Sequence, residues 1–192
     1  MYLFLISSSR VIEYLEQRAH KANVTPVKVA VVYVYLRYSD RHQLTADKIV
    51  KCLLKQLVCQ LDVFPCELDK WQYPRPSTVG LSKLFIDYAS QFFKVFMVLD
   101  GLDECERIYR ENLLPHIQRF LDAGLKVFYS CRMGLQINLS SQKIGEIEIV
   151  SRREDLAIFI TERLKHANTI GELTDENREV IIKTIVKKSE GL

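Results

Sequence analysis

The sequence predicts an α/β fold in which a parallel sheet lies between two layers of helices. Residues 95–99 are all apolar, which is typical of a strand buried on both faces. Residues 27–38 and 125–131 are also rich in β-branched, aromatic and other apolar side chains. Amphipathic helical patterns separate these runs, and strands that alternate with helices form parallel sheets with helices on both sides.

The first half of the chain begins with a helix, a strand and a second helix. Residues 9–23 predict a helix whose inner face consists of Val11, Ile12, Leu15 and Ala19. Residues 27–38 predict a central strand. Thr45 is a suitable N-cap for the next helix, and apolar residues then recur with a helical period from Ala46 to Leu61.

The second half continues the alternation after a proline-containing connector at residues 62–80. We expect a helix at residues 81–93, strands at 95–100, 125–131 and 146–150, and helices at 110–123, 151–166 and 175–188. Gly124 is placed to stop one of these helices, and Ser151 and Thr174 are placed to cap the last two. The expected inner faces of the last two helices consist of Leu156, Phe159, Ile160, Leu164, Val180, Ile181 and Ile185.

Composition excludes several functional classes. With 192 residues, of which 48% are hydrophobic, the chain is long enough for one domain with a core. The net charge of +3 and the mixed charge pattern give no reason to expect nucleic acid as a ligand. The five cysteines are odd in number and form no C-x-x-C pair, which favours a reducing, cytoplasmic compartment. No secretory signal is apparent, and no apolar run has the length of a membrane span.

The segment most informative about function is the strand that ends at Asp100. Its carboxylate should emerge at the C-terminal edge of the sheet, where open α/β sheets bind their ligands. A carboxylate there suits Mg²⁺, which prefers hard oxygen ligands, as in a Walker B site. Gly101 would leave space beside it for a phosphate, and Asp103 or Glu104 could orient an attacking water. Such a site normally works with a phosphate loop, G-x-x-x-x-G-K-[ST], which this sequence does not contain.

Each of these residues also has a plainer interpretation. Asp100 and Gly101 could simply begin a loop, and Asp103 and Glu104 could cap a following helix. Arg132 follows an apolar strand and could bind a γ-phosphate, or it could form a surface ion pair with a carboxylate. Ser7, Ser8 and Ser9 could meet an anion, but a helix cap or a solvated face is the commoner role.

A seven-residue spacing of cysteines invites a metal interpretation. The three positions are Cys52, Cys59 and Cys66. No histidine lies on that face, and Cys66 lies beyond the helix, so buried free thiols are the favoured interpretation.

Five segments together carry a resemblance to a known family. They are VYVYLRY at residues 32–38, LLKQL at 53–57, VFMVLDGLDEC at 95–105, KVFYSCR at 126–132 and EGL at 190–192. In their order and spacing, over residues 9–192, the chain resembles the NACHT module of STAND-class P-loop NTPases. It is most similar to the nephrocystin-type N-terminal module of fungal multidomain proteins that often carry ankyrin or WD repeats.

The resemblance implies a fold and a set of roles. The fold is the three-layer parallel sheet of the P-loop NTPase type. Asp100 would bind Mg²⁺ as the Walker B aspartate, with Gly101 beside it, and Asp103 or Glu104 would be the acid near the attacking water. Arg132 would be the sensor arginine. The family uses ATP and Mg²⁺ in a switch, in which nucleotide binding and slow hydrolysis govern an oligomerising signalling protein.

The chain departs from the family at its beginning. Residues 1–6 occupy the place of the phosphate loop, so residues 1–192 are interpreted as a single, N-terminally truncated P-loop domain with weak or lost nucleotide binding and no ATPase activity of its own. Residues 2–5 could act as a short substitute strand. The alternative function is a non-catalytic interaction module that self-associates or binds intact NACHT proteins. A phosphatase or kinase of another α/β class is a third hypothesis, but no C-x5-R motif supports it.

Overall fold

A computed structural model of the chain describes residues 2–22, 28–40, 44–63, 65, 77–132, 134–135, 137–140, 145–147, 153–166 and 174–189. The chain divides into two compact units, Met1–Ile144 and Gly145–Leu192, which are considered separately below. The expectation that residues 1–192 form a single domain stays a prediction.

The first unit is built on a sheet of three parallel strands, β1 (Val29–Tyr35), β2 (Lys94–Asp100) and β3 (Lys126–Tyr129), in the order β1-β2-β3. Tyr35 pairs with Asp100 at the carboxyl end of the sheet. The central strand β2 is buried along most of its length, as its all-apolar sequence predicted. The α/β fold with a parallel sheet is therefore confirmed.

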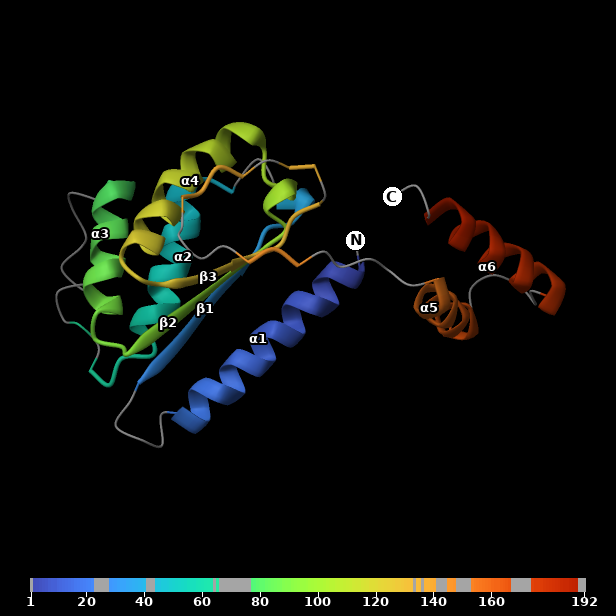
Figure 1. Cartoon of the computed structure of the whole chain (residues 1–192), viewed down its shortest axis with the longest axis horizontal. Coiled ribbons are helices and arrows are strands. Elements are labelled where there is room, and N and C mark those ends of the chain that lie inside the picture. Colours follow the sequence, from blue (N-terminus) through green and yellow to red (C-terminus); the bar gives the residue numbers. More distant parts are fainter. Residues whose placement is uncertain are drawn as a thin grey trace. The chain divides into compact units, whose positions relative to one another are not determined.

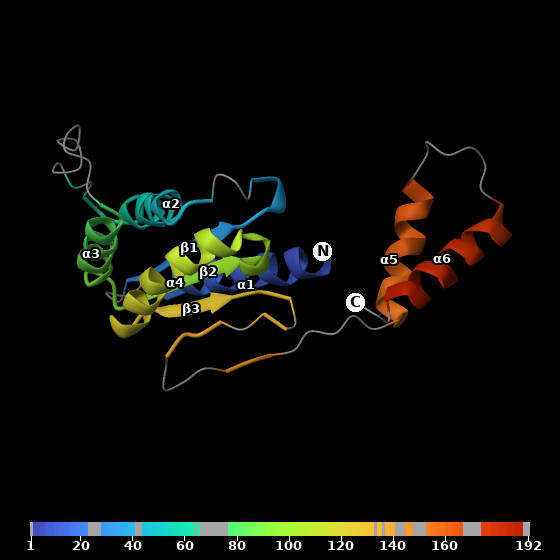
Figure 2. The ribbon, with the colours of Figure 1, turned by 90° about the horizontal axis from the view of Figure 1, so that it is seen from above.

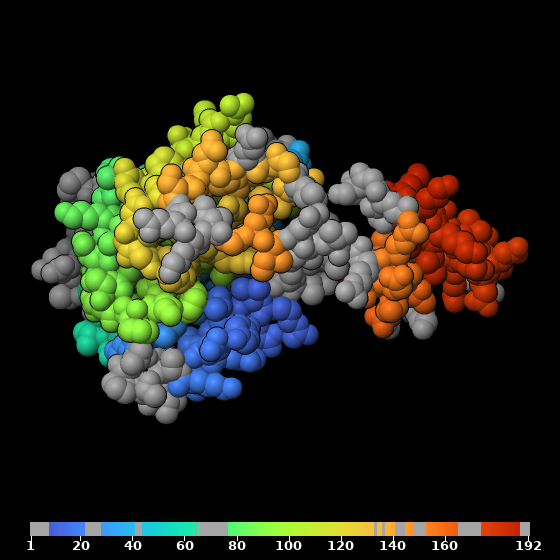
Figure 3. Space-filling model, viewed as in Figure 1, coloured from blue at the N-terminus to red at the C-terminus, as the bar shows by residue number. Residues whose placement is uncertain are grey.

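Helices cover both faces of this sheet, which makes three layers (Figures 1 and 2). The helix α1 (Tyr2–Ala22) packs on β1 and β2 from one side. The helices α2 (Ala46–Val58), α3 (Thr78–Ala89) and α4 (Arg107–Asp122) form the layer on the other side. Figure 3 shows α1 as a surface helix, and its predicted inner face is confirmed by the burial of Ile12 and Ala19.

The main core lies between the sheet and the second helical layer. Phe85 of α3 and Phe120 of α4 are fully buried there, with ring centroids 4.9 Å apart. From α2, the apolar residues that the helical period predicted contribute Ile49, Leu53 and Leu57. This core fixes α4 and α2 over the sheet, and so it also fixes the loops at the carboxyl ends of the strands.

Local signals place the helix ends. The hydroxyl of Thr45 accepts a hydrogen bond from Lys48 N, as expected of an N-cap, and Gly124 follows α4 with a φ of 88°. The helix α3 begins three residues earlier than predicted because Ser77 caps it, accepting a hydrogen bond from Gly80 N.

The start of α1 corrects one expectation. Residues 2–5 were expected as a possible substitute strand, and this was wrong, because they form the first turns of α1. The sequence from residue 2 to residue 22 contains neither glycine nor proline. Nothing therefore interrupts the helix that the amphipathic pattern of residues 9–22 establishes.

The second unit contains α5 (Arg153–His166) and α6 (Asp175–Ser189), which pack on each other. Ile160 is buried, and Thr174 caps α6 by accepting a hydrogen bond from Asn177 N, both as predicted. Val180 and Ile185 were predicted to face inward, which was wrong, since they are 59% and 43% exposed. Two helices share only one interface, so each buries a narrower stripe than a helix that packs on a sheet.

Two further expectations concern the ends of this unit. Residues 146–147 form no strand, and the rest of the strand expected at 146–150 lies outside the described residues, as does Ser151. Within the described part of the chain, no helix is long and apolar enough to cross a membrane.

Candidate functional site

Asp100 lies buried at the carboxyl end of the central strand, with 4% of its surface exposed. Its Oδ1 accepts two hydrogen bonds, from the hydroxyl of Ser8 at 2.6 Å and from that of Ser130 at 2.5 Å. Ser8 comes from α1, and Ser130 follows β3 directly. The carboxylate therefore joins three elements, one from the helical layer and two from the sheet.

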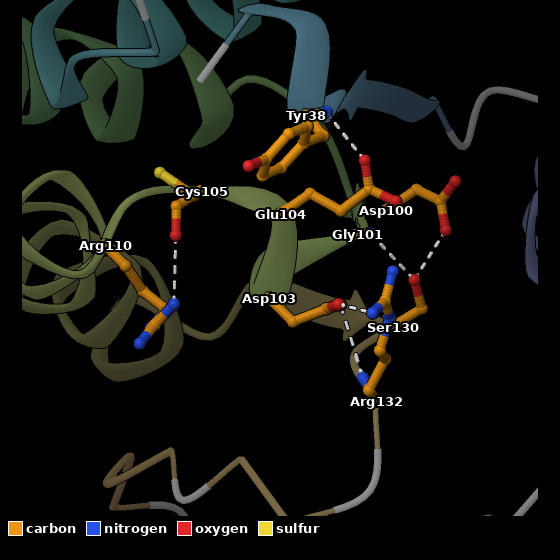
Figure 4. A network of polar contacts seen from close by, with 9 residues as sticks. All are labelled: Tyr38, Asp100, Gly101, Asp103, Glu104, Cys105, Arg110, Ser130 and Arg132. Atoms are coloured by element: carbon orange, nitrogen blue, oxygen red, sulfur yellow. Dashed lines mark hydrogen bonds and ion pairs between the residues drawn. The ribbon is translucent and has the colours of Figure 1, made fainter. Parts of the chain in front are cut away.

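Ser130 also holds the loop that follows Asp100. Its hydroxyl accepts a hydrogen bond from Gly101 N at 2.9 Å (Figure 4). Its backbone oxygen accepts one from Leu102 N at 2.9 Å. This role of Ser130 was not predicted from the sequence, and Ser8 was predicted only as part of a helix cap or an anion contact. The available signal for Ser130 was its position at the end of an apolar strand beside the one that ends at Asp100.

Gly101 is required by a close approach of backbone to backbone. It adopts a left-handed φ of 77°, and a Cβ at this position would lie 2.8 Å from the backbone oxygen of Leu36. The N–H of Leu36 in turn donates to the backbone oxygen of Asp100 at 2.8 Å. The turn at Gly101 thus lies against the end of β1, and a larger residue would push the two apart.

The structure brings Asp103 and Arg132 together, a pairing that the sequence did not predict. The Nε of Arg132 lies 3.1 Å from Oδ2 of Asp103, and the N–H of Arg132 donates to Oδ1 at 3.2 Å (Figure 4). Asp103 is largely covered, while the side chain of Arg132 is 68% exposed. This contact matches the plainer interpretation of Arg132, an ion pair with a carboxylate.

Glu104 makes a different contact on the other side of the loop. Its Oε2 accepts a hydrogen bond from Tyr38 N at 2.7 Å, at the start of the short helix η1 (Tyr38–Asp40). Asp103 and Glu104 belong to their own short helix, η3 (Leu102–Glu104). The residue at the N-cap of α4 is Glu106. The contacts of Asp103 and Glu104 therefore tie the loop to the ends of β3 and β1.

The thiol of Cys105 lies next to this loop and is 2% exposed. It donates a long hydrogen bond to the backbone oxygen of Leu44, and burial raises its pKa, although the nearby Arg110 acts in the opposite direction. The guanidinium of Arg110 donates to the backbone oxygen of Cys105 at 3.0 Å. Burial of this kind makes a thiol less reactive as a nucleophile and is typical of a packing residue.

The cysteines of α2 correct a second expectation. Cys52 and Cys59 were expected to be buried thiols, which was wrong, because Cys52 on α2 and Cys59 at its C-cap are both exposed. The buried face of this helix is taken up by larger apolar residues. Cys66 lies outside the described residues, among which no cluster of three or more metal-binding side chains occurs.

The oxygen atoms at and around Asp100 are of the chemical type that binds Mg²⁺. One carboxylate and two hydroxyls are hard donors, and Mg²⁺ usually keeps several waters or phosphate oxygens as further ligands. The site offers fewer groups that could bind a triphosphate. The segment before Ser8 is helical, and beyond its first turn a helix uses its backbone N–H groups internally.

Open parallel α/β sheets bind their ligands at the carboxyl ends of their strands, and Asp100 lies at that edge of this sheet. The family model described as "Nephrocystin 3, N-terminal" matches residues 6–132, and the chain belongs to that family. The matched segment runs from α1 to Arg132 and contains every residue of the site described above. No curated protein matches the chain.

Proposed function

We propose that the chain is part of a NACHT-type, STAND-class nucleotide switch of a signalling protein, and that Asp100 marks the site of Mg²⁺ and ATP. The observation that carries the proposal is the position of Asp100 at the carboxyl end of the central parallel strand, with hydroxyls of two other elements on its carboxylate. Membership of the nephrocystin 3 N-terminal family supports it.

In this function Asp100 holds the metal ion, whose charge would neutralise the phosphates. Arg132 lies at the end of the neighbouring strand and, with its exposed guanidinium, is available to a terminal phosphate once it leaves Asp103. Asp103, released by the same movement, is then free to accept a proton from water. Glu104 holds the end of β1 through Tyr38 N and is the second candidate for that role.

We further propose that these 192 residues alone hold nucleotide weakly and hydrolyse it little. They contain no G-x-x-x-x-G-K-[ST] sequence, which in P-loop proteins supplies the main anchor for the triphosphate. A single carboxylate and its metal ion leave most phosphate oxygens without a partner.

The second candidate function is a non-catalytic interaction module that associates with intact NACHT proteins. The observation that favours it is that all three acids of the site are already bound inside the unit, Asp100 by hydroxyls, Asp103 by Arg132 and Glu104 by Tyr38 N. Acids that are committed to structural contacts are what a domain that has lost its chemistry would retain.

Calorimetric titration of the full chain with ATP and Mg²⁺ tests the first proposal. We compare the wild type with Asp100→Asn, which keeps one acceptor oxygen for the serine hydroxyls, and with Asp47→Asn. Asp47 is the matched control because it is a carboxylate paired with Lys51 on the surface of α2.

The expected result is millimolar binding that Asp100→Asn abolishes and Asp47→Asn leaves unchanged. Micromolar binding that depends on Asp100 would refute the claim that this chain holds nucleotide weakly. Binding that is equal in all three proteins would place the nucleotide elsewhere and refute the role of Asp100. A complete absence of binding, combined with capture of an intact NACHT protein, would favour the interaction module.

A further inference from the structure

Among the residues that the structure describes, the outer edge of β1 is covered by side chains and not by another strand. In a parallel ladder the backbone groups of alternate residues face the neighbouring strand. The N–H of Leu36 donates across to Asp100, so the residues two, four and six positions before it also face β2. The backbone groups of Val31 and Tyr33 therefore point away from β2, toward the edge of the sheet.

Gln56 of α2 and Gln60, in the turn that follows α2, bind all four of these backbone groups. Gln60 accepts from Val31 N at 3.1 Å through Oε1 and donates to Val31 O at 2.8 Å through Nε2. Gln56 accepts from Tyr33 N at 2.9 Å and donates to Tyr33 O at 2.7 Å in the same way. Each amide thus presents one donor and one acceptor, as a residue of an adjacent strand would.

The spacing of helix and strand makes this match possible. Gln56 lies in α2 and Gln60 lies two residues past its end at Val58, and four residues span about 6 Å along a helix axis. Val31 and Tyr33 are two residues apart, which is about 6.6 Å along a strand. Since the later glutamine binds the earlier strand residue, α2 runs antiparallel to β1 along its edge, and one i,i+4 pair covers two successive edge positions.

The edge that these glutamines cover is of a kind that readily pairs. The sequence of β1 is VAVVYVY, and it contains no charged residue, no proline and no glycine. Natural edge strands are usually protected by such residues, and β-branched and aromatic side chains favour strand pairing. A second copy of β1 offers the same uncharged sequence, and antiparallel pairing about a two-fold axis would satisfy both edges at once.

We propose that Gln56 and Gln60 form a glutamine clamp, a surrogate strand that prevents the β1 edge of one chain from pairing with the β1 edge of a second copy. The clamp consists of side chains from α2 and the turn after it, bound to β1, and it includes none of the residues whose side chains contact Asp100. Opening the clamp exposes a pairing edge, and closing it leaves the amides of Val31 and Tyr33 protected within a single chain.

The test compares three full-length chains: the wild type, Gln56→Met with Gln60→Met, and Gln118→Met. Methionine keeps the length and helix propensity of glutamine but lacks the amide donor and acceptor. Gln118 is the matched control, since its amide accepts from Ser140 N at 2.8 Å and donates to Ser140 O at 2.8 Å, away from any strand edge. Mass is measured by light scattering over a range of concentrations, and amide exchange is measured by NMR or mass spectrometry.

We expect the double variant to form a larger species than the wild type and Gln118→Met at the same concentration. At low concentration its Val31 and Tyr33 amides should exchange at least about tenfold faster than in the wild type, and association should protect them again. An unchanged mass would overturn the proposal, as would association in which these two amides keep exchanging fast. If the double variant loses its helical circular dichroism, Gln60→Met alone is tested, with the Val31 amide as the readout and the same two outcomes.

Discussion

Replacement of Gly101 by alanine measures how closely the loop after β2 is held against the end of β1. An L-residue in the left-handed conformation costs about 1–2 kcal/mol, and Gly101 has a φ of 77°. The new Cβ would also lie 2.8 Å from the backbone oxygen of Leu36, which is too short for any real contact. Displacing that backbone adds about 1–3 kcal/mol, as other overpacking changes do.

The chain supplies its own control for the conformational part of this effect. Gly124 has a φ of 88°, but a Cβ there would meet no atom within 4 Å. Gly124→Ala should therefore cost only the conformational term of about 1–2 kcal/mol. The excess loss in Gly101→Ala, at least about 1 kcal/mol, reports the contact with Leu36.

Urea unfolding followed by near-ultraviolet circular dichroism gives the free energy of unfolding of each variant. This signal comes from packed aromatic side chains, so it reports the core of the first unit. Equal losses of stability in Gly101→Ala and Gly124→Ala would refute the inference that the approach to Leu36 makes glycine necessary. Such a result would mean that the loop moves away at no cost.

Three further changes probe the core and the contacts of the site. Phe120→Ala should destabilise by about 3–5 kcal/mol because its ring is fully buried, while the 72% exposed Phe93 should tolerate alanine within about 0.5 kcal/mol in the same urea assay. Ser130→Ala should lower the free energy of unfolding by about 1–3 kcal/mol, because a buried carboxylate oxygen and a backbone N–H each lose one hydrogen-bond partner. A smaller loss of stability than in Phe93→Ala would contradict this. Burial lowers the pKa of His116 below its usual 6.5, so the histidine of the unfolded chain takes up a proton first as the pH falls. The free energy of unfolding of the wild type should therefore decline as the pH falls below 6.5, and His116→Gln should lack this decline.

The sheet could be predicted from sequence because its strands have nearly unbroken apolar sequences. The run before Asp100 predicted β2 and its end at that residue, since only a strand buried on both faces needs such a sequence. The extent of α1 was not predictable in the same way. Residues 1–6 were interpreted through their position in place of the family's phosphate loop, while their own sequence contains no residue that would stop a helix.

The site was predicted in its positions but not in its contacts. Local sequence alone placed Asp100 and Arg132 each at the end of an apolar strand. The serine hydroxyls on Asp100 could not, because a single serine belongs to no pattern and Ser8 lies 92 residues away in the chain. The same holds for Glu104, whose partner Tyr38 N lies 66 residues away. Such contacts depend on how far apart the finished helix and sheet lie.

Asp100 and Asp103 differ in how easily each could leave its present partner. Asp100 is buried and accepts two short hydrogen bonds. A buried polar group that loses its hydrogen-bond partner costs about 1–3 kcal/mol. The partner of Asp103 is an arginine that is 68% exposed, and ion pairs with such exposure contribute about 0–1 kcal/mol. A phosphate that attracts Arg132 therefore has little to overcome in separating it from Asp103. If the site responds to a ligand, the movement should begin at the Asp103–Arg132 pair, while Asp100 and its two serines remain in place as the fixed part of the site.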